Sequence, residues 1–252
     1  MENNPAVTIL ICNYNYADYV GEAIQSAYEQ TYPNCRLCIV DDASSDNSME
    51  VINKAIEDPP IATVLIPLEK NCGASEARNI GIRACIDTTD YFLILDADDE
   101  CYADKVERMI EKTVSNPQIG VVYADYHILN TETGNIMYEY KYPFDTPHLH
   151  QECIVHSQSL ISSNAFRSTQ EGDNFYDPAL HGPASGSFIG CCEDYDLWLR
   201  VAEQFMIVHI PQPLSRVRVT GRNQSTITNV TDEVWQKNVQ HIQTKIKQRR
   251  NG

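Results

Sequence analysis

The sequence predicts an α/β doubly wound domain, in which a mostly parallel sheet carries helices on both of its faces. Short apolar runs typical of buried strands alternate with segments of roughly 10 to 15 residues at helical spacing, and such alternation is typical of crossover connections between parallel strands. The chain has 252 residues, of which 42% are hydrophobic. This is enough apolar mass for one sizeable core.

The first half of the chain supplies the regular elements. Five buried strands are expected, at Val7–Cys12, Arg36–Asp41, Ala62–Ile66, Tyr91–Asp96 and Ile119–Tyr123. Helices are expected from Asp18 to the residues before Pro33, after Asp46, over 74–86 and over 103–115. Each of these helical segments repeats apolar residues at spacings of three and four, which indicates one buried side.

The second half is less regular, because residues 126–190 are rich in polar, Gly and Pro positions. Strand-like runs at 126–129 and 136–140 flank a turn at Gly134, which predicts a hairpin. A helix over 194–205 and strands over 208–210 and 214–219 follow. The C-terminal segment predicts an amphipathic helix with Trp235, Val239, Ile242 and Ile246 on its apolar side.

The composition excludes several classes of protein. Nineteen Lys and Arg against 35 Asp and Glu give a net charge of -16, and so acidic a surface repels nucleic acid. The sequence shows neither a signal peptide nor an apolar membrane span. The nine cysteines are an odd number without an export signal, which predicts free thiols and a cytoplasmic location. Cys35 and Cys38 form a C-x-x-C pattern inside a predicted strand, and we interpret them as core residues.

Acidic residues follow the fourth predicted strand, at the edge of the sheet where parallel sheets bind ligands. Asp96 and Asp98 flank one small residue there. Two carboxylates so close repel one another, and a divalent cation such as Mg²⁺ or Mn²⁺ relieves that repulsion. A solvated turn is the alternative interpretation of the same pattern.

Other strand ends deliver polar and aromatic groups to the same edge. Cys12 and Tyr14 follow the first strand, and Asp41 and Asp42 end the second. Carboxylates here are suited to a ribose or a base edge, and a tyrosine to stacking on a base, although helix capping and ordinary packing explain them as well. The sequence lacks both the G-x-G-x-x-G fingerprint and the P-loop pattern, which argues against a dinucleotide-dependent dehydrogenase and against an NTPase.

Five motifs in order resemble the family 2 nucleotide-sugar glycosyltransferases of GT-A fold. They are VTILICNYNY from Val7, VDDASSD from Val40, NCGASEARNIG from Asn71, LDADD from Leu95 and EDYDLWLR from Glu193. The resemblance is close over about residues 5–125, loose over the following segment, and returns at about 190–225. It implies a GT-A-like sheet with a nucleotide-sugar-binding half (5–125), an acceptor-side half of the same domain (126–225) and a C-terminal helix (226–252).

The resemblance also implies roles for individual residues. Residues lining the nucleotide site are Cys12, Tyr14, Asp41, Asp42, Arg78 and Asp96. Asp98, with Asp96 beside it, is implied to hold Mn²⁺ or Mg²⁺ on the diphosphate, while Asp99 has no assigned role. Asp194 is implied to be the catalytic base, with Glu193 as the second candidate, and a plain helix cap is the alternative for Asp194.

The expected activity is metal-dependent transfer of a sugar from a nucleotide-diphosphate sugar, preferably UDP-linked, to an acceptor hydroxyl. One carboxylate base and no covalent intermediate imply a single displacement with inversion. A nucleotidyltransferase and a non-catalytic binding module of the same fold are the alternatives. The acceptor is a glycan, a lipid-linked sugar or a protein, and the sequence does not distinguish them.

Two further regions carry open alternatives. Arg218 and Arg222, in and after the last predicted strand, are either diphosphate ligands or surface residues. The basic C-terminal helix either contacts the inner face of a membrane, docks on a partner or packs on its own domain.

Overall fold

The first half of the chain forms the parallel part of one sheet, as predicted. The computed structural model describes residues 4–114, 116–180, 192–220 and 232–251. Strands β1 (Val7–Asn13), β2 (Cys35–Asp41), β3 (Thr63–Pro67) and β4 (Tyr91–Asp96) are mutually parallel in the order β3-β2-β1-β4. These elements match the predicted strands within about two residues. β1, β2 and β4 are buried over most of their length and consist of nearly continuous apolar residues, as strands covered on both faces do.

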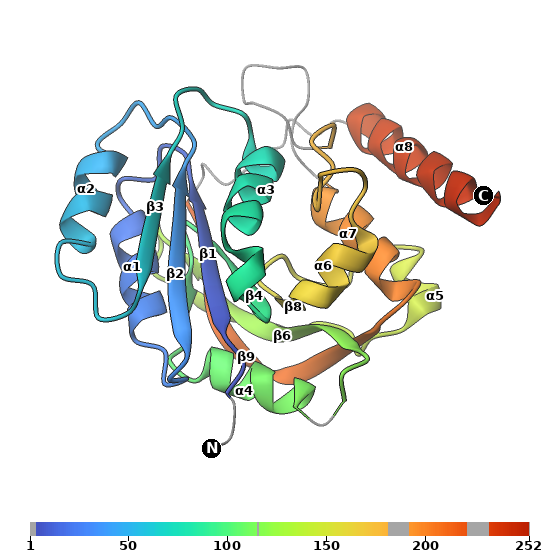
Figure 1. The fold of residues 1–252 in the computed structure, drawn as a ribbon, viewed down its shortest axis with the longest axis horizontal. Helices are drawn as coiled ribbons and strands as arrows, with labels where there is room; N and C mark the ends of the chain where they lie inside the picture. Colours follow the sequence, from blue (N-terminus) through green and yellow to red (C-terminus); the bar gives the residue numbers. More distant parts are fainter. Residues whose placement is uncertain (1–3, 115, 181–191, 221–231, 252) are drawn as a thin grey trace.

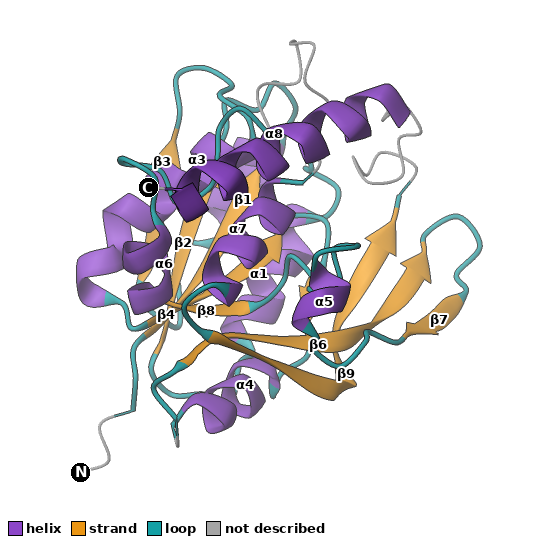
Figure 2. Ribbon diagram, turned by 90° about the vertical axis from the view of Figure 1, so that its right-hand side faces the viewer, coloured by secondary structure: helices purple, strands orange, loops and turns teal. Residues whose placement is uncertain are grey.

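The second half extends this sheet beyond β4. The order continues β8-β6-β9-β5, with β8 (Leu160–Ser162) antiparallel to both of its neighbours. The long strands β6 (Ile119–Asn130) and β9 (Met206–Val219) are parallel to each other, and β5 (Glu100–Cys101) pairs with β9 at the edge. Figure 2 shows β6, β7 and β9 as a twisted extension of the sheet. The sheet is therefore mixed but mostly parallel, as the fold class predicts.

Two details of the second half differ from the expectation. The predicted strands at 119–123 and 126–129 are one strand, β6, and those at 208–210 and 214–219 are one strand, β9. The two strands pair through register shifts around Asp125, so polar residues that interrupt the apolar pattern still belong to the ladder. The predicted hairpin is confirmed, since β7 (Ile136–Glu139) pairs with β6 antiparallel.

Helices cover both faces of the sheet, as predicted (Figure 1). One buried cluster contains residues of α1 (Val20–Tyr28), α2 (Ser48–Ala55) and α4 (Lys105–Thr113). The other contains residues of α3 (Ala74–Cys85), α6 (Ser163–Thr169) and α7 (Glu193–Ala202). The two short helices η1 (Ile86–Thr88) and α5 (Thr146–Leu149) complete the described helices before the C-terminal one.

The cysteines behave as the sequence predicts. The eight within the described residues are all free thiols. Cys35 and Cys38 are buried in opposite clusters, one on each face of the sheet, which confirms that they are core residues.

The C-terminal helix α8 (Asp232–Asn251) packs against its own domain. Ile242 is 1% exposed and belongs to the cluster that contains α7. The Lys245 Nζ lies 2.8 Å from Asp177 Oδ2 and 3.1 Å from Asp196 Oδ2, so a basic residue of the helix is neutralised within the chain. The side chain of Trp235, predicted for the apolar side, lies outside the described residues.

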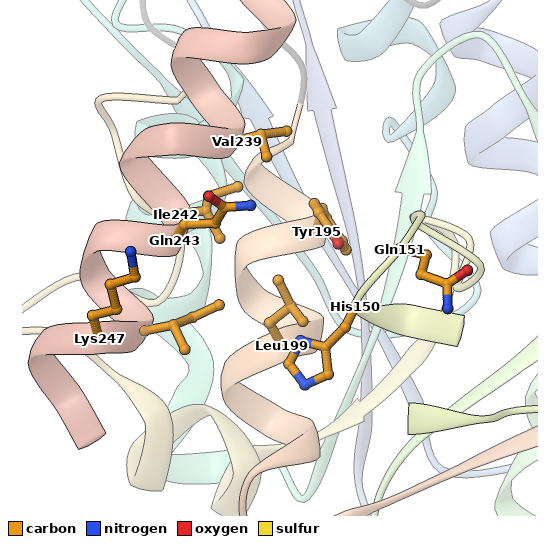
Figure 3. Close-up of a pocket in the computed structure, with 9 residues that line it drawn as sticks. His150, Gln151, Tyr195, Leu199, Val239, Ile242, Gln243 and Lys247 are labelled. Atoms are coloured by element: carbon orange, nitrogen blue, oxygen red, sulfur yellow. The ribbon is translucent and has the colours of Figure 1, made fainter. Parts of the chain in front are cut away.

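A pocket of about 320 Å³ lies between α7, α8 and the residues that follow α5. Tyr195 and Leu199 of α7 face Ile242 of α8 across it, and His150 closes one side (Figure 3). Among the described residues, α8 and every other helix falls short of the length and apolarity that a membrane crossing requires.

Candidate active site

Arg78 joins the parts of the chain that were expected to form the site. Its guanidinium Nη2 lies 3.1 Å from Asp96 Oδ1 at the end of β4. The Nη1 atom lies 2.7 Å from Glu193 Oε1 and 3.6 Å from Asp194 Oδ1, at the start of α7. The structure thus brings the strand-end carboxylates and the candidate base together, although Glu193 and Asp194 are about 100 residues away from them in sequence.

The guanidinium is buried but strongly stabilised in its charged form. Arg78 is 6% exposed, and burial alone would lower its pKa. Asp194, Glu193 and Asp96 more than compensate, so the pKa of Arg78 lies well above its ordinary value. Arg78 therefore stays cationic in a protein that is otherwise strongly acidic.

Helix α3 places Arg78 by packing closely on β1. A Cβ atom at Gly81 would clash with Leu10 Cδ1, so any other residue there would force the Leu10 side chain to shift. The next residue along from Arg78, Asn79, fixes a segment of the second half. Its Oδ1 accepts from Tyr176 N at 2.8 Å and its Nδ2 donates to Tyr176 O at 2.8 Å.

Asp96 and Asp98, the two carboxylates predicted to bind a metal, have different surroundings in the structure. Asp96 is committed to Arg78 and accepts from Ser157 Oγ at 3.1 Å. Asp98 is only 6% exposed, and burial together with the nearby charge of Asp96 raises its pKa to about 7. The Tyr16 hydroxyl donates a hydrogen bond to Asp98.

Arg218 anchors this loop to β9. Its Nη1 donates to Asp98 O at 2.9 Å, and its backbone N donates to Asp99 Oδ1 at 2.7 Å. The same guanidinium pairs with Glu22 and Glu100. Arg218 is thus 3% exposed and holds the acidic loop, so the surface interpretation is wrong. Arg222 lies outside the described residues.

The carboxylates of the loop after β4 could supply part of the ligands of a divalent cation, with substrate phosphates supplying the rest. Within the described ranges, the structure contains no group of three or more His, Cys, Asp or Glu side chains that could hold a metal alone. A buried carboxyl that resists ionisation, such as Asp98, gains from a nearby cation. Mg²⁺ is usually held by one or two carboxylates plus substrate phosphates, which is what this loop offers.

The carboxylates of Asp41 and Asp42, at the end of β2, accept hydrogen bonds from neighbouring residues of the chain. Asp42 accepts from Cys72 N at 2.7 Å and from Gly73 N at 2.9 Å, so it holds the loop that leads into α3. Asp41 accepts from Asn13 Nδ2 at 2.8 Å and Ser44 Oγ at 2.7 Å. Their predicted contact with a base therefore stays a prediction.

Cys12 and Tyr14 complete the predicted set. Burial raises the pKa of the Cys12 thiol to about 12, and Arg78, Asp96 and Asp42 are all close enough to act on it. Cys12 therefore sits between the ends of β2 and β4. Tyr14 is half-buried directly after β1.

The strand-end loops also contain two strained positions. Asn15 and Ala43 adopt φ values of 61° and 57°. Asparagine tolerates this left-handed conformation, whereas an alanine there is uncommon, and such backbone strain is concentrated at functional sites.

Several residues of the cluster were missed by the sequence analysis. Asn79, next to Arg78, binds the backbone of Tyr176, Ser157 donates to Asp96, and Gln158 donates to Asp99. Gln158, Tyr176 and Ser157 lie in irregular segments without periodicity. Only Asn79, adjacent to Arg78 in the EARNIG motif, carried a local signal.

Comparison with known proteins identifies the family. A model of glycosyl transferase family 2 matches residues 8–174, about two thirds of the chain. The chain belongs to glycosyl transferase family 2. This confirms the resemblance and the prediction of a glycosyltransferase.

Similar sequences are found among bacterial glycosyltransferases. An uncharacterized glycosyltransferase of Haemophilus influenzae is 27% identical over 91% of this chain and 70% of its own length. A chondroitin synthase of Escherichia coli is 27% identical over 88% of this chain, and one of Pasteurella multocida is 27% identical over 82%. The chain spans only 30% and 20% of these two synthases.

Solved structures share the fold. Residues 1–349 of Staphylococcus aureus TarS, in complex with UDP-GlcNAc, match 96% of this chain and 66% of that one, with a TM-score of 0.70 and 14% identity. A mannosyltransferase of Pyrobaculum calidifontis, in complex with GDP-Man and Mn²⁺, matches 88% of this chain and 59% of that one, with a TM-score of 0.66 and 18% identity. These neighbours confirm the GT-A fold.

Proposed function

We propose that this chain transfers a sugar from a nucleotide-diphosphate sugar to an acceptor hydroxyl, with inversion at the anomeric carbon. The observation that carries the proposal is the ion-pair cluster of Arg78, which ties the acidic loop after β4 to Asp194. Donor-side and base-side groups of an inverting transferase must lie this close, because nucleophile and leaving group occupy opposite sides of one carbon atom.

Asp194 is the proposed base. An acceptor hydroxyl is a poor nucleophile, and a carboxylate that removes its proton during attack accelerates the reaction. Asp194 lies in the first turn of α7, whose Leu197 and Trp198 are fully buried and fix the helix. Glu193 is held by the closer contact to Arg78, which leaves it less suited to accept a proton.

Asp98, with Asp96 beside it, is proposed to hold Mn²⁺ or Mg²⁺ at the donor diphosphate. When bound, such a cation supplies positive charge to the leaving group. Arg218 holds the backbone of Asp98, so the carboxylate is positioned before substrate arrives. Arg78 contributes a permanent positive charge at the same site.

The donor is proposed to be UDP-linked. The TarS neighbour was solved with UDP-GlcNAc, whereas the Pyrobaculum calidifontis neighbour was solved with GDP-Man, so both nucleotides occur on this fold. The names of the chondroitin and hyaluronan synthases among the relatives favour a glycan acceptor and a role in polysaccharide synthesis. A cytoplasmic location and a peripheral membrane or partner contact of α8 stay predictions.

Family membership disfavours a nucleotidyltransferase, and a non-catalytic module remains the second candidate. A panel of nucleotide sugars incubated with Mn²⁺ separates these candidates. A transferase releases a nucleoside diphosphate, a nucleotidyltransferase exchanges pyrophosphate, and a binding module does neither.

The first prediction concerns the base. Asp194→Asn keeps the size of the side chain but removes its basicity, so turnover should fall by roughly 10² to 10⁴ while donor affinity changes little. Initial rates of diphosphate release and calorimetric donor binding measure the two quantities. Asp58→Asn, an exposed carboxylate on the loop after α2, is the control. Normal turnover of Asp194→Asn would move the base to another residue, and Glu193→Gln would be tested next.

A further inference from the structure

The Tyr176 side chain is an unexplained feature of the candidate active site. Its exposed fraction is 0%, yet within the described parts of the chain its hydroxyl has no hydrogen-bond partner. An unpaired buried hydroxyl costs about 1 to 3 kcal/mol of folding free energy. Such a group calls for an explanation, since nearly all buried polar atoms are paired.

The position of Tyr176 is firmly fixed. Asn79 binds both its backbone N and its backbone O, and Arg200 Nη2 donates to the neighbouring Phe175 O at 2.7 Å. The ring is tilted by 55° against that of Phe166, with 6.1 Å between ring centroids. The backbone that carries this side chain is therefore fixed by hydrogen bonds to its N–H and to its carbonyl oxygen.

The ring lies against the carboxylate cluster. The Arg78 Cζ atom is 5.3 Å from the Tyr176 ring centroid, and the same guanidinium is 3.6 Å from Asp194. Burial raises the pKa of Tyr176 well above its ordinary value, and Asp194 is the charged group that acts on it most strongly. The hydroxyl thus remains protonated and can donate a hydrogen bond.

Among the three carboxylates around Arg78, Asp194 is held most loosely by it. Asp96 and Glu193 are within hydrogen-bond distance of the guanidinium, at 3.1 and 2.7 Å, whereas the 3.6 Å to Asp194 is an ion pair only. A base must be oriented when the acceptor arrives, and Arg78 does not supply that orientation alone.

We propose that Tyr176 is a positioning residue for Asp194, donating its hydroxyl proton in a hydrogen bond to that carboxylate when substrate occupies the site. The inference rests on the proposed function, in which Asp194 is the base. A hydroxyl-to-carboxylate bond is short and charge-assisted, so it orients the base and stabilises its ionised form.

The test is Tyr176→Phe, which removes only the hydroxyl. Turnover should fall roughly tenfold or more, by the loss of a hydrogen bond to a charged group, while the KM for the donor stays unchanged. A hydrogen bond to the ionised form lowers a pKa, so its loss raises the pKa of Asp194. The acidic limb of the profile of kcat against pH should therefore move to higher pH, a change that a structural role would not cause.

Stability supplies an independent readout. The Tyr176 hydroxyl makes no hydrogen bond with the described residues, so its removal breaks none. The Tyr176→Phe protein should therefore melt at the wild-type temperature or above it. Tyr32→Phe is the matched control, since the Tyr32 hydroxyl donates to Pro5 O at 2.8 Å away from the cluster. It should melt at a lower temperature and keep the wild-type kcat and pH profile.

Tyr176→Phe with wild-type kcat and pH profile would overturn the inference, and so would a loss of activity that only follows a loss of folded protein. If the wild-type enzyme transfers sugar and Tyr176→Phe gives either of these results, only the positioning role of Tyr176 is contradicted and the proposed function stands. A wild-type chain that transfers no sugar from any donor contradicts the proposed function, and the inference falls with it.

Discussion

Two aspartates at equivalent positions after buried strands have different roles in this site. Asp42 and Asp98 both follow buried strands, yet Asp42 accepts hydrogen bonds from the loop before α3, while the pKa of Asp98 is raised to about 7 by burial and Asp96. The Asp42 carboxylate accepts hydrogen bonds from backbone N–H groups, whereas the Asp98 carboxylate is buried near the negative charge of Asp96. The difference lies in the neighbours, which come from distant parts of the chain.

The structural role of Asp42 leads to a prediction at this scale. Asp42→Asn replaces one acceptor oxygen by an NH₂ group, which then faces the N–H donor of either Cys72 or Gly73. The free energy of unfolding should fall by about 2 kcal/mol, since hydrogen bonds to a charged acceptor are lost. Urea unfolding measures it, with Asp87→Asn as the control because the Asp87 side chain is 86% exposed. An unchanged urea midpoint for Asp42→Asn would contradict the structural role.

At the scale of elements, α8 is attached to the domain by ion pairs as well as by apolar contacts. Asp177 accepts from Lys245 Nζ at 2.8 Å and pairs with His241 at 2.9 Å. Burial opposes ionisation of Asp177, but these hydrogen bonds dominate and lower its pKa to about 2. The predicted amphipathic helix is therefore held on its polar side too.

This attachment should depend on pH. The folded pKa of Asp177 lies below the value of 3.8 for an unperturbed group, so its stabilisation is present above pH 4 and is lost as the pH falls towards 2. Asp177→Asn should lower the free energy of unfolding by about 1 to 2 kcal/mol at pH 6, and the difference from wild type should be much smaller at pH 2, close to the folded pKa of about 2. Thermal unfolding across this pH range measures the effect. A difference that is the same at pH 2 and pH 6 would contradict the assignment.

The sequence predicted some elements better than others for physical reasons. β1, β2 and β4 are continuous apolar runs, because helices cover both faces, and such runs are recognisable without a partner. The paired strands β6 and β9 are defined by their mutual ladder across Asp125, which periodicity does not detect. The two- and three-residue strands β5 and β8 are too short for any pattern.

The same reasoning separates the predicted from the missed site residues. Asp96, Asp98 and Asp194 stand in motifs, and Arg78 joins Asp96, in the loop segment that also holds Asp98, to Asp194 of α7. Tyr176 stands in no motif, and its relation to Arg78 depends on contacts between residues about 100 positions apart.

At the scale of the whole molecule, the fold buries the cationic side chain of Arg78 inside a protein that is strongly acidic. The net charge of -16 repels a nucleoside diphosphate. Arg78 offsets this locally, but three carboxylates surround it, so its charge is already shared. We therefore propose that tight donor binding requires an additional cation at Asp98, and this is the central claim of this account.

Calorimetric titration with UDP, with and without Mn²⁺, tests that claim most directly. For the wild-type protein, Mn²⁺ should strengthen UDP binding by about tenfold or more, equivalent to about 1.4 kcal/mol. Asp98→Asn should lose this enhancement while its binding without metal stays the same or improves, because one negative charge is removed. An Asp98→Asn protein that keeps the full Mn²⁺ enhancement would contradict the account.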